Sequence, residues 1–191
     1  MTPLRNVEEF LEIRMSDPNV WLALGTWILA IVTIVAVGRQ VAASKNAAQQ
    51  TLFVQLTREY QGSSMRLLRK NFAGWLHAYL LDVARAPDPL ADETVLEFLE
   101  NLGYLTRKDY LHIDFVWNYF SDTVIGFWNA ARNPIAQRRA DHSDPQLFSE
   151  LEWLYGELLK FDAERSRKTI AEVTWSPAKT KIFLVGEMNL L

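Results

Sequence analysis

The longest apolar stretch of the chain runs from Val20 to Val37, eighteen residues without a charged side chain, before Arg39 ends it. A helix needs about 20 residues, and at least roughly 17, to cross the hydrocarbon core of a bilayer. The pattern therefore predicts a transmembrane helix over residues 18–38. The positions that we assign to the membrane include Val20, Trp21, Trp27 and Val37.

Two other structures could carry such a stretch, a cleaved signal peptide and a buried core helix. A signal peptide has a basic first region and a shorter apolar core, whereas the residues before this stretch carry four acids against two bases. A core helix usually shows a polar face, and here only Thr26 and Thr33 are polar. Both observations favour a membrane helix.

Lysine and arginine flank the apolar stretch unevenly. Residues 39–58 contain three bases and no acid, while residues 1–17 contain two bases and four acids. Because basic flanks tend to stay in the cytoplasm, we expect the N-terminal tail of residues 1–17 outside and the rest of the chain inside.

No Pro or Gly interrupts residues 39–61, which are rich in Ala. We therefore expect the membrane helix to continue as a stalk up to residue 61. Val41, Ala48 and Gln55 fall seven residues apart, which is a weak seam for self-association of copies of the chain.

Apolar residues recur at helical spacing through residues 62–171, in segments separated by caps and breakers. We expect helices from Ser63 or Ser64 to about Ala84, from Asp92 to Gly103, from Asp114 to about Arg132, and from Pro145 to about Ile170. This pattern predicts an all-α fold: a transmembrane helix, a stalk and a cytoplasmic helical bundle.

The C-terminal tail of residues 172–191 is ambiguous. Residues 181–185 are apolar enough for a strand, whereas Ser176 followed by Pro177 is typical of a helix start. The sequence leaves both structures open.

Composition excludes several kinds of site and partner. Seven Trp, ten Phe and six Tyr indicate a folded chain. The absence of Cys excludes disulfides, Cys-ligated zinc and a thiol nucleophile. A net charge of −3 argues against nucleic acid as a partner, although the half nearer the apolar stretch is basic and the distal half acidic.

No pattern of known chemistry appears in the sequence. The histidines His77, His112 and His142 have no metal-ligand spacing, the glycines form no phosphate loop, and no serine sits in a nucleophile elbow. We therefore expect no metal, no cofactor and no catalytic residue. An enzyme would need paired carboxylates in a polar pocket, and we rank it last.

Two groups of basic residues are candidates for contact with a lipid or an anionic ligand. Arg66, Arg69 and Lys70 share one helical face, which could be solvated, lie against anionic headgroups or hold an anion. The second group is Arg132, Arg138 and Arg139.

Trp128 lies close to the second basic group in sequence. It could stack on a nucleotide base while arginine holds the phosphate. Its helical spacing favours a place in the core instead.

The segment VLEFLENLGYLTRKDYLHIDFVWNYF, from Val95, is followed by a Trp in the next helix, then by Arg138 and Arg139, and then by LFSELEWLYGELLKF, from Leu147. In this order they resemble a family of small bacterial membrane proteins with one N-terminal span and a helical cytoplasmic domain of unknown function. The resemblance covers about residues 75–161. It implies an inner-membrane location and a helical fold, and it brings no catalytic residues with it.

Together these features favour a non-enzymatic scaffold or interaction protein anchored in the bilayer. Its partners would be lipid, a second protein or further copies of the chain. The alternative is a ligand-gated oligomeric membrane effector of the antiphage-defence type that senses an anionic nucleotide. In that case we expect Arg138 and Arg139 to converge on a cavity.

Overall fold

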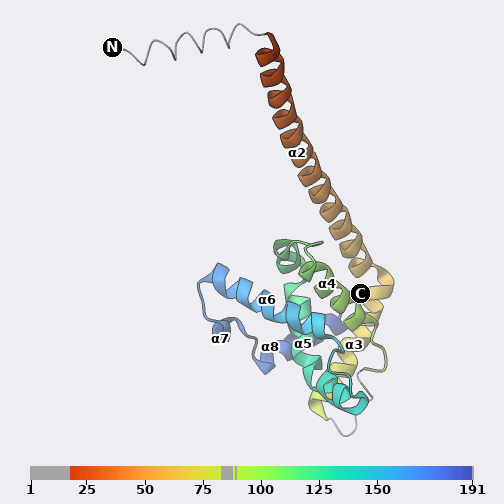
Figure 1. Ribbon diagram of the computed structural model, residues 1–191. Coiled ribbons are helices and arrows are strands. Elements are labelled where there is room, and N and C mark those ends of the chain that lie inside the picture. The colour runs from red at the N-terminus through yellow and green to blue at the C-terminus, as the bar shows by residue number, and fades with distance from the viewer. Residues whose placement is uncertain (1–17, 83–87, 89, 191) are drawn as a thin grey trace. The chain divides into compact units, whose positions relative to one another are not determined.

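The computed structural model describes residues 18–82, 88 and 90–190 (Figure 1). All regular structure in these residues is helical, so the all-α prediction is confirmed for the described part of the chain. The N-terminal tail of residues 1–17, residues 83–87 and residues 89 and 191 lie outside the described residues.

The first helix, α2, extends over 44 residues, Pro18–Gln61. The chain divides after Ala48 into two compact units. In the first unit the apolar side chains of α2 that can be described are exposed, Trp27 for 69% of its surface. Gly25–Gln61 contains a window with a mean hydropathy of 1.7, none of it buried, which is long and apolar enough to cross a membrane.

The second unit begins at Gln49, inside α2. Leu56 and Tyr60 are buried in its core, and Leu52 and Phe53 pack against that core. These positions follow helical spacing and form one apolar face. The last turns of α2, which the sequence assigns to a stalk, are thus the first core helix of this unit.

Five further α-helices of the second unit are longer than one turn. They are α3 (Ser63–Leu81), α4 (Thr94–Arg107), α5 (Ile113–His142), α6 (Ser149–Ser166) and α8 (Pro177–Met188), with the single turn α7 (Ile170–Val173) between the last two. The closest helix pairs are α4 with α6, α3 with α8, and α5 with both α6 and α8. Phe72, Phe120 and Phe127 are among the largest fully buried side chains.

The sequence predicts that helix α5 ends at about Arg132, because Asn133 and Pro134 follow. Instead α5 continues to His142. Pro134 removes one main-chain donor. However, Pro134 and its neighbours Ala131 and Ile135 are buried, so packing maintains the helix through the proline. The helix ends where Ser143 adopts a left-handed conformation, with φ of 54°.

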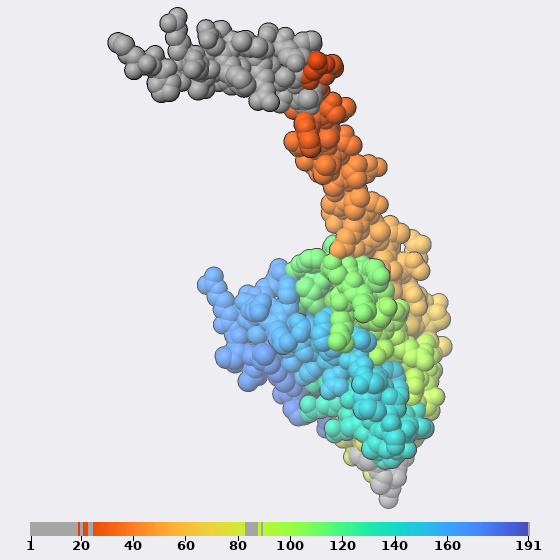
Figure 2. All heavy atoms as spheres, viewed as in Figure 1, coloured from red at the N-terminus to blue at the C-terminus, as the bar shows by residue number. Residues whose placement is uncertain are grey.

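Gly103 does not end α4, which continues to Arg107. A Cβ at position 103 would overlap the main-chain carbonyl of Glu150 at the start of α6. The glycine therefore serves close packing of these two helices, which lie side by side on the face shown in Figure 2.

The C-terminal tail is helical, and residues 181–185 form no strand. Ser176 caps α8, its Oγ accepting the amide of Lys179 at 3.2 Å. Phe183 packs edge-on against Phe127, and Leu184 is fully buried. Helix α8 is therefore part of the core.

Candidate functional site

Arg69 lies in the interior of the second unit. Its Nε and Nη2 donate to the two carboxylate oxygens of Glu187 at 2.8 and 2.6 Å, and the two side chains are 8% and 10% exposed. The guanidinium also lies 3.9 Å from the centre of the Tyr60 ring. Arg69 is thus not the lipid or ligand contact suggested by the sequence, because Glu187 and the core already surround it.

Tyr60 connects this pair to α5, since its hydroxyl is hydrogen-bonded to Thr123. Burial raises the pKa of Tyr60 above its ordinary value, so the phenol stays neutral. The cluster joins the end of α2 to α3, α5 and α8.

The other two bases of the first group have different surroundings. Arg66 is exposed and donates from Nε to the carbonyl of Gln61 at 2.8 Å. Lys70 is half-buried and has no ion pair or hydrogen bond within the described part of the chain. Only these two could still meet a headgroup or an anion.

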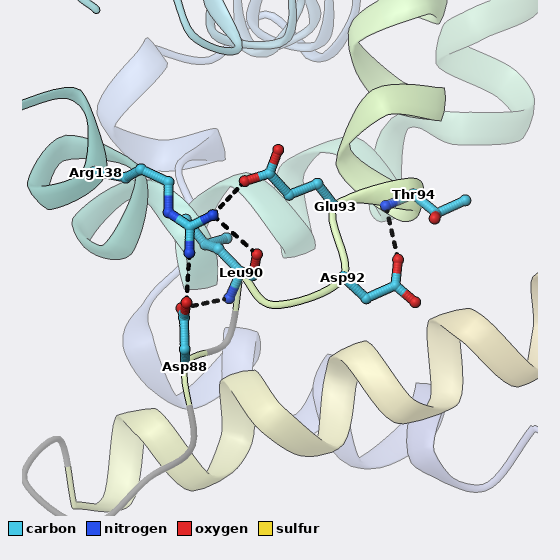
Figure 3. Close-up of polar contacts among 6 residues, drawn as sticks. All are labelled: Asp88, Leu90, Asp92, Glu93, Thr94 and Arg138. Carbon is cyan, nitrogen blue, oxygen red and sulfur yellow. Dashed lines mark hydrogen bonds and ion pairs between the residues drawn. The ribbon is translucent and has the colours of Figure 1, made fainter. Parts of the chain in front are cut away.

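Arg138 projects from α5 toward the segment before α4 (Figure 3). Its guanidinium donates to the carboxylates of Asp88 and Glu93, and to the carbonyl of Leu90 at 3.1 Å. These three acceptors use much of its donor capacity. Its visible role is to hold this segment against α5.

Helix α4 begins at Thr94 with Glu93 as its N-cap, so Asp92, the expected cap, lies one residue before the cap position. Its Oδ1 still accepts the amide of Thr94 at 3.0 Å (Figure 3). Hydrogen bonds from the side chain and backbone of Thr94 lower the pKa of Asp92. The carboxylate is therefore suited to satisfy the first free amides of the helix.

Arg139 holds the segment before α6. It donates to the carbonyl of Leu147 at 2.8 Å and to the Glu152 carboxylate at 2.8 Å, and lies 6.0 Å from the ring centre of Trp128. Trp128 is buried against Tyr155. This places Trp128 in the core, as its spacing predicted, and not on an open stacking surface.

Glu100 of α4 has a role that the sequence did not reveal. Its carboxylate accepts the amides of Glu150 at 3.1 Å and Leu151 at 2.6 Å. The N-cap of α6, Phe148, supplies no side-chain cap, so Glu100 provides it from another helix. Burial raises the pKa of Glu100, an effect that these hydrogen bonds only partly oppose.

Arg132 differs from Arg138 and Arg139 because it lines a pocket of about 260 Å³ between α5 and the start of α8. Neither of the other two arginines lines it. The second basic group of the sequence is therefore divided into two structural arginines and one that faces a cavity.

A larger pocket, of about 330 Å³, lies beside His112. Its lining includes Glu157, which is paired with Lys160 at 2.7 Å, and Thr106, whose hydroxyl donates to the carbonyl of Leu102. Within the described residues, no group of three or more His, Cys, Asp or Glu could hold a metal ion.

Comparison with known proteins gives a family but no activity. The chain matches no curated protein and no solved structure. Residues 20–158 match a family described as a domain of unknown function, DUF4760. The match extends from the apolar part of α2 into α6, and α7 and α8 lie beyond it. Since it covers well over half of the sequence, the chain belongs to the DUF4760 family.

Proposed function

We propose that the protein is a non-enzymatic, membrane-anchored interaction module. The apolar part of α2 inserts into a bilayer, and the helical second unit binds a partner protein or further copies of the chain. The observation that carries the proposal is the exposure of the α2 segment. Its valines, isoleucines, leucines and tryptophans are open along many turns, and water is an unfavourable surrounding for so much apolar surface.

The polar groups of this segment suit a lipid environment. The hydroxyls of Thr26 and Thr33 donate to the carbonyls of Leu22 and Leu29, each at 2.8 Å. Every donor in hydrocarbon needs an internal partner, and the helix itself supplies one for each hydroxyl.

The use of charge in the second unit supports a binding role over catalysis. Arg69 and Arg138 each hold together parts of the chain that are distant in sequence, and Arg139 holds the end of α5 to the start of α6. Glu100 caps a neighbouring helix. The most buried charges therefore hold the fold, which suits a rigid module that presents a surface.

The location follows from the same proposal. We place the second unit in the cytoplasm of a bacterial cell, attached to the inner membrane, because residues 39–58 are basic and the N-terminal tail is acidic.

A ligand-gated membrane effector is the second candidate. The observation in its favour is the pocket that contains Arg132 and Lys181. The expected convergence of Arg138 and Arg139 does not support it, because both guanidinium groups are held by carboxylates.

Native mass spectrometry of the full chain, extracted gently from its own membranes, tests the two candidates. A monomer or dimer that carries a second protein would support the interaction module. A chain that carries neither a second protein nor further copies of itself would contradict the interaction module, and a fixed homo-oligomer with a bound small anion would favour the effector. Arg132→Gln should remove such an anion, whereas Arg58→Gln, the loss of an exposed base outside the pocket, should retain it.

A further inference from the structure

The pocket beside Arg132 is formed by four parts of the second unit. They are the end of α3, the middle of α5, the connection before α8 and the first turns of α8. The lining residues are Leu80, Asn129, Arg132, Asn133, Thr174, Trp175, Pro177, Thr180 and Lys181. Its volume of about 260 Å³ lies near the lower end of the range of small-molecule sites, which begins at roughly 300 Å³.

Two basic side chains, both exposed, supply the charge of this pocket. Arg132 and Lys181 both line it, and no acidic residue does. Neither side chain forms an ion pair or hydrogen bond with any residue in the described ranges. Arg69, Arg138 and Arg139 in the same unit are all paired with carboxylates. Two like charges that share a cavity favour the entry of an anion.

The neutral polar residues of the pocket offer further hydrogen bonds. Asn133 is exposed. Asn129 accepts the Tyr155 hydroxyl on Oδ1 at 3.1 Å, while its Nδ2 is buried without a partner among the described residues.

One wall of the pocket is aromatic and held in place. The ring of Trp175 lies 4.0 Å from the Lys179 ammonium and packs edge-on against Phe183 at 5.8 Å. Leu80 and Pro177 add apolar surface. A ligand with a small flat or apolar body would find contact there.

We propose that this pocket binds a small organic anion, whose phosphate or carboxylate group lies between Arg132 and Lys181 and whose body rests against Trp175. The volume suits a monoester or a small acid and is too small for a dinucleotide or a macromolecular segment. The proposal is independent of the interaction module, since either can hold without the other.

Phosphorus NMR tests the proposal. Inorganic phosphate and phenyl phosphate are each titrated with the full chain in maltoside micelles. Both probes should bind saturably. Arg132→Gln and Lys181→Gln should each weaken binding of either probe about tenfold, the effect of losing one charge-assisted hydrogen bond. Arg58→Gln removes the same charge from an exposed position of α2 and should change binding less than about twofold.

Trp175→Ala tests the aromatic wall separately. Phenyl phosphate should bind about tenfold more tightly than inorganic phosphate, because stacking on an aromatic ring contributes about that factor. The variant should lose this preference and still bind inorganic phosphate. Comparable thermal melts of the variants would establish that they are folded.

Three results would overturn the proposal: non-saturable binding, equal losses in Arg132→Gln and Arg58→Gln, or displacement of the probe by phosphatidylglycerol added to the micelles. The last result would assign the pocket to a lipid headgroup, and the soluble anion would be excluded.

Discussion

Among individual residues, Arg69 and Glu187 form the most buried ion pair of the described part of the second unit. Each is removed from water, which is costly for a charge, and the two hydrogen bonds between them offset that cost only while both are present. The Tyr60 ring against the guanidinium adds a cation–π contact. The pair lies 118 positions apart in sequence, so no local pattern could have revealed it.

Glu187→Gln should lower the free energy of unfolding by about 3–5 kcal/mol, because a buried guanidinium would lose its counter-charge. Urea unfolding of the full chain in micelles measures it. Glu59→Gln, an exposed acid of α2, is the control and should change stability by less than about 0.5 kcal/mol. Arg69→Met combined with Glu187→Leu should cost less than the sum of the single changes. Equal costs for Glu187→Gln and Glu59→Gln would contradict this account.

Two glycines within helices should respond oppositely to alanine. At Gly126 a Cβ would overlap the Phe183 ring, and at Gly156 it would meet nothing within 4 Å. Gly126→Ala should destabilise the chain by about 1–3 kcal/mol through overpacking. Gly156→Ala should stabilise it by up to about 1 kcal/mol through helix propensity. Thermal melts compare them, and shifts of the same sign would refute the packing assigned to α8.

Glu100 makes a contribution to stability that depends on pH. Burial raises its pKa in the folded chain, so the folded state binds the proton more tightly than the unfolded state. The resulting stability is fully present below the unfolded pKa and is lost as pH rises through the folded pKa. The difference in unfolding free energy between the wild type and Glu100→Gln should therefore grow in favour of the wild type between pH 7 and pH 4. A difference that shrinks on acidification would contradict this sign.

Among the elements, α8 contributes more to the core than the sequence predicts. It lies beyond the part of the chain that matches the family, yet it supplies Leu184, Phe183 and Glu187 to the interior. The Ser176 cap was readable from the sequence because capping is local chemistry. Its burial against α3 was not, since that depends on contacts between distant segments.

The other elements also combine features that local sequence predicts with features that depend on contacts between distant segments. Periodicity and breakers gave the helices of the second unit, because both act over a few residues. Pro134 and Gly103 do not end helices, although local propensity predicts that they do. Packing keeps Pro134 within α5, and Gly103 allows close approach to Glu150. Of the basic candidates, Arg132 lines a pocket while Arg69 is buried, a distinction that only the partners in the folded chain decide.

Truncation before Ile170 should abolish cooperative unfolding of the second unit. It removes α8, uncovers Phe127 and leaves Arg69 without its carboxylate partner. Limited proteolysis of membranes that contain the full chain or the truncated chain measures the effect. Truncation after Met188 keeps α8 and is the control. Equal resistance of all three chains would mean that α8 is dispensable.

At the scale of the whole molecule, the chain combines an exposed apolar helix with a unit whose most buried charges are paired with each other. The first feature explains how the chain would be held at a membrane, and the second why the unit would present a fixed surface. The apolar pattern could be read from the sequence because a bilayer imposes a minimum length on a helix. The partner could not be read, because binding surfaces follow no such rule.

The most direct test of the membrane anchor is extraction of membranes with alkaline carbonate, followed by flotation on a density gradient. The full chain should stay with the lipid. Ile28→Arg combined with Val32→Arg should release it, because each arginine near the middle of a span costs about 2.5–3.5 kcal/mol. Val54→Arg with Leu67→Arg, at exposed apolar positions of the second unit, should leave it in the lipid fraction. Release of the unaltered chain by carbonate would contradict the central claim.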